Sequence, residues 1–156
     1  MTPSPETLAA EVPLRRVDRL LTHYALSHQH PTNERIHYTA IPCIMLSLVG
    51  LLYVASPMLA LVFLGASLLY YWRLSTVFLI TMMAVTVVML AIIATLNAKH
   101  ILLPVCLMVF VVAWIFQFIG HRIEGKKPSF FEDVQYLWVG PLFVLSRLFI
   151  KLGVRW

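Results

Sequence analysis

Residues 74–96 read LSTVFLITMMAVTVVMLAIIATL, a run of 23 residues that contains no charged side chain. As an α-helix rising 1.5 Å per residue, this run is about 35 Å long, enough to cross a hydrocarbon core of about 30 Å. A second uncharged run follows at residues 101–119. Two apolar runs of this length predict two transmembrane helices.

Two more apolar runs precede this pair. Residues 38–55 form a run that ends at the turn signal Ser56-Pro57, and residues 58–72 form a shorter one that ends in Tyr70-Tyr71-Trp72. Aromatic residues of this kind are typical of the membrane–water interface. The four runs together predict an all-α protein with four transmembrane helices.

A fifth apolar stretch covers residues 134–150, after a polar loop at 120–133. Ser129 and Glu132 form a capping-box pattern that predicts a helix start near Phe130. Gly140-Pro141 is expected to interrupt that helix, and Arg147 lies inside it. We therefore expect an interfacial or broken C-terminal helix rather than a fifth crossing.

The composition agrees with a membrane protein. Of 156 residues, 60% are hydrophobic and 12% are charged, whereas soluble domains have roughly 45–50% apolar and about 25% charged residues. This balance excludes a soluble enzyme and a disordered chain. We expect a single membrane domain over residues 1–156, with residues 1–20 as a flexible N-terminal segment that does not resemble a secretion signal.

The distribution of positive charges predicts the orientation and argues against a nucleic-acid partner. Lysine and arginine separate the apolar runs and do not cluster among aromatic residues. With four spans and a cytoplasmic N-terminus, Lys99 lies alone outside. Eleven positive residues share the cytoplasmic side: Arg15, Arg16, Arg19, Arg35, Arg73, Arg122, Lys126, Lys127, Arg147, Lys151 and Arg155. This positive-inside bias predicts the orientation and favours four spans over five. We expect the protein in a bacterial inner membrane, or in the endoplasmic reticulum membrane in a eukaryote.

Neither cysteine indicates a metal or disulfide site. Cys43 and Cys106 both lie inside apolar runs, and they form no CxxC spacing. We interpret them as small core or lipid-facing residues.

Five of the six histidines fall at one predicted end of the protein. These five are His23, His28, His30, His37 and His121. The sixth, His100, is predicted to lie on the opposite side of the membrane. Imidazole suits iron, copper, zinc and nickel, so histidines gathered at one depth indicate a metal site on the cytoplasmic side. The alternative is a set of histidines that lie in hydrated headgroups, since no spacing matches an HExxH motif or a zinc finger.

The polar residues near these histidines have more than one interpretation. Asn33 and His37 share a helix face, so Asn33 either orients the His37 ring or only begins the helix. Gln117, one turn before His121, either holds that ring, contacts a bound carboxylate or hydrogen-bonds to another helix. Glu124 is a ligand, a ring-orienting acceptor or a solvated loop charge.

Two blocks of residues resemble the membrane 2-hydroxy fatty acid dioxygenases, the fungal α-oxidation enzyme and its bacterial relatives. The first block is His28-Gln-His-Pro31-Thr-Asn33-Glu-Arg-Ile-His37, continuing into Ala40-Ile-Pro42. The second is Trp114-Ile-Phe-Gln117-Phe-Ile-Gly120-His121, followed by Glu124-Gly-Lys-Lys-Pro128 and then by Asp133, Gln135, Leu137 and Pro141. The resemblance covers the chain from about residue 20.

This resemblance implies an iron(II)-dependent enzyme that uses O₂ to shorten a 2-hydroxy fatty acid by one carbon. The metal ligands that it implies are His28, His37 and His121. His30 is a further candidate, at a position where the family often has Asn. The accompanying catalytic positions are Asn33, Gln117 and Glu124.

Other classes of protein remain open at this stage. One is a histidine-ligated haem or electron-carrier membrane protein, and another is a non-catalytic helical scaffold or small transporter. A desaturase-type di-iron enzyme is a weaker alternative. The pattern of such enzymes is three histidine-containing motifs with eight or more histidines in total, and this chain has six.

Overall fold

A computed structural model describes residues 14–26, 28–125 and 136–156. Every regular element in these ranges is an α-helix, as the sequence predicted. The helices are α2 (Arg16–Ala25), α3 (Pro31–Ala55), α4 (Pro57–Trp72), α5 (Thr76–Ala98), α6 (Leu102–Ile123) and α8 (Val139–Leu152).

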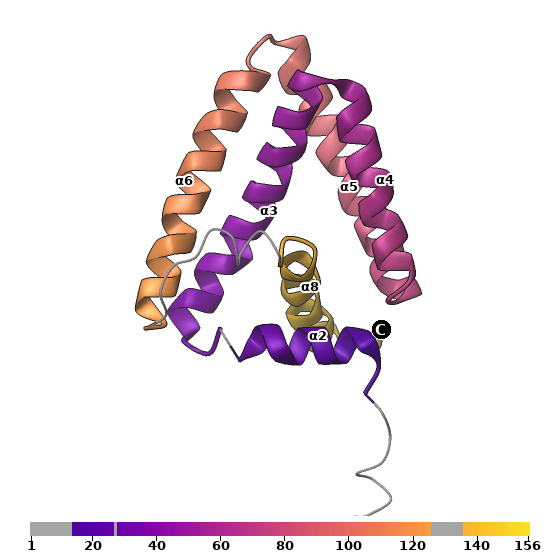
Figure 1. Ribbon diagram of the computed structural model, residues 1–156, viewed down its shortest axis with the longest axis vertical. Helices are drawn as coiled ribbons and strands as arrows, with labels where there is room; N and C mark the ends of the chain where they lie inside the picture. Colours follow the sequence, from indigo (N-terminus) through magenta and orange to yellow (C-terminus); the bar gives the residue numbers. More distant parts are fainter. Residues whose placement is uncertain (1–13, 27, 126–135) are drawn as a thin grey trace, which may run out of the picture.

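Helices α3 to α6 form two successive hairpins (Figure 1). Helices α3, α5 and α6 are each long and apolar enough to cross a membrane. Helix α4 has 16 residues, so it is apolar but shorter than these three, and it corresponds to the short second apolar run of the sequence. The start of α3 and the end of α6 lie at the same end of the protein, and α2 and α8 lie at that end too (Figure 1). This arrangement is the one that brings the two histidine-containing blocks together.

Helix α3 begins seven residues before the apolar run that predicted it. His30 is its N-cap residue, with φ −73° and ψ 123°, and Pro31 occupies its first turn, where a missing N–H costs no hydrogen bond. The helix then continues to Ala55. The polar residues Asn33 and His37 therefore belong to the same rigid element as the first span.

Helix α8 lies in the C-terminal apolar stretch. It begins at Val139, so Gly140-Pro141 fall in its first turn, where a proline costs no hydrogen bond. The helix ends at Gly153, which has the left-handed conformation (φ 69°) that glycine adopts without steric cost. The start predicted near Phe130 lies outside the described residues.

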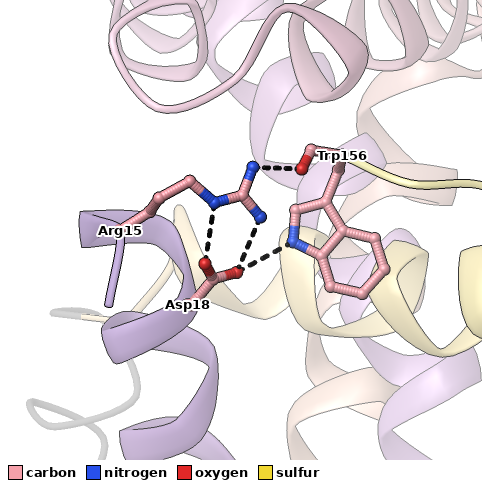
Figure 2. Close-up of polar contacts among 3 residues, drawn as sticks. All are labelled: Arg15, Asp18 and Trp156. Atoms are coloured by element: carbon pink, nitrogen blue, oxygen red, sulfur yellow. Dashed lines mark hydrogen bonds and ion pairs between the residues drawn. The ribbon is translucent and has the colours of Figure 1, made fainter. Parts of the chain in front are cut away.

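Helix α2 is amphipathic and packs on α8. Its buried side chains, Val17, Leu21 and Tyr24, recur at helical spacing along one face. At its start, the Arg15 guanidinium donates hydrogen bonds to the Asp18 carboxylate and to the Trp156 carbonyl, and Trp156 Nε1 donates to Asp18 at 3.2 Å (Figure 2). These contacts hold the beginning of α2 against the end of the chain.

Helices α3 and α6 approach each other closely at two glycines. A methyl group at Gly50 would overlap Cys106 Sγ, and one at Gly120 would overlap Asn33 Oδ1. Small residues of this kind let transmembrane helices pack backbone to backbone. Cys106 is therefore a core residue of this contact, as its apolar surroundings in the sequence predicted.

Candidate metal centre

Three histidines from distant parts of the sequence meet at the end of the α3–α6 pair. His28 precedes α3, His37 lies in the second turn of α3, and His121 lies in the last turn of α6. All three are buried, with exposed fractions of 4%, 0% and 7%. One ligand atom from each lies within 4.8 Å of the others. We call these residues the histidine cluster.

The main chain fixes the orientation of two of these rings. His28 Nδ1 lies 2.8 Å from the Tyr24 carbonyl oxygen, and His37 Nδ1 lies 2.9 Å from that of Asn33. A carbonyl oxygen only accepts, so each Nδ1 carries the proton and each Nε2 presents a lone pair. Metal-bound histidines are held in this way by a hydrogen bond from their other nitrogen.

The cluster fits a transition-metal ion. His37 Nε2 is buried and has no hydrogen-bond partner among the described residues. Burying an unpaired polar atom costs free energy unless a bound ligand pairs with that atom. Two nitrogens bound to one ion at about 2.1 Å lie at most about 4.2 Å apart, so the rings need to close only slightly. Three imidazoles also leave coordination positions open for other ligands.

Aromatic side chains cover the cluster. Tyr24 stacks on His28 with ring centroids 4.1 Å apart and planes inclined by 11°. Phe143 of α8 lies 5.7 Å from His28 and 5.0 Å from Tyr24, measured between ring centroids. The apolar shell around a metal site controls solvent access and the local dielectric constant. Tyr24 of α2 and Phe143 of α8 therefore shield His28 from water on this side of the cluster.

Glu124 connects the two blocks that carry the cluster. As the C-cap residue of α6, it accepts hydrogen bonds from the main-chain N–H groups of Gln29 (2.8 Å) and His30 (2.9 Å), and from Asn33 Nδ2 (2.9 Å). Partial burial raises the pKa of Glu124, but these three hydrogen bonds outweigh it and hold the pKa below its ordinary value. The carboxylate is therefore a stable anion that anchors the start of α3, and it lies outside the cluster.

Asn33 acts through both its side chain and its main chain. Its side-chain amide donates to Glu124, while its main-chain carbonyl accepts from His37. The atom of Asn33 that contacts the His37 ring is thus its main-chain carbonyl oxygen, and its side chain contacts Glu124 instead. Gln117 is 3% exposed, and its Oε1 has no hydrogen-bond partner in the described part of the chain. That oxygen is available to a bound molecule.

The other histidines do not join the cluster. His30 is exposed, and its Nδ1 accepts from the Thr32 N–H at 3.2 Å, so it caps α3. His23 Nδ1 lies 3.1 Å from the Tyr136 hydroxyl. His100 belongs to the turn between α5 and α6. Figure 1 shows this turn at the end of the protein opposite α2 and α8, as predicted.

Sequence reasoning missed several residues of this site. Gly120 permits the close approach of α6 to Asn33 and so sets the distance between the two blocks. Its place directly before His121 was the available signal. Tyr24 and Phe143 were also missed, because nothing in their local sequence shows that they contact His28.

These features define an all-helical membrane protein with a buried three-histidine centre at one end of its helices. The chain matches the family described as "2-hydroxy-palmitic acid dioxygenase Mpo1-like" over residues 14–152, and it belongs to that family. The resemblance noted in the sequence is thereby confirmed.

A short stretch of the chain is similar to one curated relative. The chain is 39% identical over 46 residues to the 2-hydroxy-palmitic acid dioxygenase MPO1 of Saccharomyces cerevisiae. This match covers 28% of the chain and 26% of the yeast protein. The chain thus spans about a quarter of the length of that relative. No solved structure matches the chain.

Proposed function

We propose that this protein is an iron(II)-dependent dioxygenase that shortens 2-hydroxy fatty acids by one carbon. The observation that carries the proposal is the buried histidine cluster, formed by the two sequence blocks on which the resemblance rests and lying within the range matched by the family. The yeast relative is named for the same reaction class. The substrates are then a 2-hydroxy fatty acid and O₂, and the cofactor is Fe²⁺.

The proposed reaction balances as R–CH(OH)–COOH + O₂ → R–COOH + CO₂ + H₂O. The C1–C2 bond breaks, C1 leaves as carbon dioxide, and C2 is oxidised to a carboxyl carbon while O₂ is reduced by four electrons. When bound by the histidine cluster, iron would supply the redox chemistry that activates O₂. The chain's own residues bind and orient the substrate and exclude water.

Each polar residue near the cluster has a role in this proposal. Gln117 Oε1 accepts the hydrogen bond of the substrate's 2-hydroxyl group, since it is buried next to His121 with no other partner among the described residues. Glu124 and Asn33 are positioning residues that hold His28 and His37 through the start of α3. His30 supports this loop as a helix cap.

The location of the cluster suits an amphiphilic substrate. The histidines lie at the end of helices whose remaining length is apolar. A carboxylate and a hydroxyl group can thus meet polar side chains while the acyl chain stays among hydrophobic ones. By the positive-inside bias, we propose that this end faces the cytoplasm.

The test is reconstitution of the purified protein with iron(II) under anaerobic conditions, followed by addition of 2-hydroxypalmitate and O₂. We expect pentadecanoic acid and carbon dioxide in equal amounts, and no product from His121→Ala. His100→Ala is the matched control, because it removes an imidazole at the opposite end. Absence of the shortened acid from the iron-loaded protein would refute the proposal, and a strong visible absorption band would favour haem.

A further inference from the structure

Two apolar cavities lie in series beyond the histidine cluster. The inner cavity, of about 20 Å³, is bordered by Tyr24, Gln117, Trp114, Ile41 and Gly140. It adjoins the cluster, because Tyr24 stacks on His28 and Gln117 is one turn from His121. The second cavity, of about 130 Å³, has only apolar lining side chains, among them Met45, Met82, Met89 and Val85. We call it the methionine cavity.

Ile41 separates the two cavities. It lines both of them, and it is 6% exposed. A methyl group added to Gly140 on α8 would lie 3.1 Å from Ile41 Cδ1, so the backbone of α8 packs closely against this side chain. Ile41 is also one turn of α3 beyond His37. It is therefore the constriction between the head-group end of the site and the methionine cavity.

A larger groove lies between α3 and α6. This α3–α6 groove, of about 560 Å³, is lined by residues that include Thr39, Cys43 and Val112. Successive helical residues are about 100° apart, so Thr39 stands about 200° from His37 and Val112 about 180° from His121, whereas Ala40, which also lines the groove, stands about 60° from His37. Neither Tyr24 nor Gln117 lines this groove, and both border the inner cavity. The inner cavity is therefore the one that adjoins the side chains next to the histidine cluster.

We propose that the acyl chain of the substrate passes Ile41 into the methionine cavity, and that this path sets the chain length accepted. The inference rests on the proposed function for the identity of the substrate. Methionine side chains suit such a path, because they are flexible and adapt to an irregular apolar ligand. Ile41 and Val85 are then specificity-determining residues, the first at the constriction and the second in the lining of the methionine cavity.

The test compares two matched variants, Val85→Trp and Val112→Trp, in nanodiscs. Each adds the same bulk to a valine on an apolar helix, the first in the methionine cavity and the second in the α3–α6 groove. The proteins receive a mixture of 2-hydroxy acids with 10 to 18 carbons. We expect Val85→Trp to lower the ratio of C18 to C10 turnover about tenfold or more, since single methylenes already change such ratios about 10–200-fold. Val112→Trp should keep the wild-type ratio.

Ile41→Ala provides the opposite change, because it widens the constriction and should raise the C18 to C10 ratio. Binding of radiolabelled 2-hydroxy acids to the iron-free proteins gives a second readout that does not depend on turnover, and it should show the same order. Equal chain-length profiles for Val85→Trp and wild type would overturn the inference, as would a shift in Val112→Trp alone. If wild type binds these acids but does not shorten them, the proposed function fails, and the binding profiles still decide the path.

Discussion

Replacement of Gly120 by alanine tests whether the close approach of α3 and α6 sets the geometry of the metal centre. A Cβ at this position would overlap Asn33 Oδ1 and would lie 3.4 Å from His37 Cε1. Asn33 is fully buried and its amide is held by Glu124 at 2.9 Å, so it cannot move aside without breaking that hydrogen bond. The added methyl group must therefore disturb the link between the two blocks.

The expected magnitude follows from three contributions. Overpacking a buried contact costs about 1–3 kcal/mol, and loss of a hydrogen bond to a charged group costs about 1.5–3 kcal/mol. The better helix propensity of alanine offsets about 1 kcal/mol. Gly120→Ala should thus lower the free energy of unfolding by about 1.5–5 kcal/mol. Iron affinity should fall about 10–100-fold, as it does when residues that orient metal ligands are changed.

Two other glycines serve as controls for this variant. Gly50→Ala overlaps Cys106 Sγ, so it disturbs the same pair of helices far from the histidines. Gly65→Ala on α4 meets open space and should leave stability nearly unchanged. Unfolding in detergent by guanidinium gives stability, and competition with a chelator gives iron affinity. If Gly120→Ala and Gly50→Ala lose stability equally and both keep wild-type iron affinity, the approach at Gly120 does not set the site.

Three further predictions concern the ligands and the topology. Alanine at any member of the histidine cluster should abolish iron binding measured by elemental analysis, whereas His100→Ala should keep it. His30→Asn should keep most of the iron, because an amide can still cap α3, whereas His28→Asn should lose it; equal loss would make His30 a ligand. In a background without native cysteines, Arg73→Cys and Lys99→Cys should react with a membrane-impermeant thiol reagent from opposite sides of sealed vesicles, and labelling from one side would contradict the four-span topology.

The fold was predictable from the sequence because the membrane imposes a simple length rule on helices. An uncharged run of about 20 residues has few alternatives, so the spans at 74–96 and 101–119 agree with α5 and α6 within a few residues. The start of α3 follows from a different signal, because its first turn is polar. Pro31 suits the first turn of a helix and predicts that Asn33 and His37 lie on it, and the structure confirms a helix that begins at Pro31 and continues through the apolar run.

The histidine cluster was predictable only through the topology. An even number of crossings between His37 and His121 returns the chain to the same end, which places both at one depth. Depth alone does not say which side chains face each other. His30 and His28 are next-but-one neighbours, yet one caps a helix in an exposed position and the other is buried against Tyr24. That difference depends on the packing of α2 and α8.

The role of Glu124 shows most clearly what the sequence leaves open. A carboxylate three residues after a histidine can bind a metal, orient a ring or face water, and local pattern does not choose among these. The choice depends on where the first N–H groups of α3 lie relative to the end of α6, which is a tertiary relationship. In the structure these N–H groups point at the carboxylate, and the positive end of the α3 dipole favours the anion there.

The two sequence blocks therefore act as one unit, in which the first supplies hydrogen-bond donors and the second supplies the acceptor. His121 and Glu124 are three residues apart at the end of α6, so one faces the cluster while the other reaches Gln29 and His30. A shift of the carboxylate by one residue would rotate it about 100° around the helix axis and leave the N–H groups without an acceptor. The loop that carries His28 would then lose its anchor, although all three histidines remained in the chain. The three-residue spacing of Glu124 from His121 is consequently what lets one turn of α6 supply both a cluster histidine and the anchor of the His28 loop.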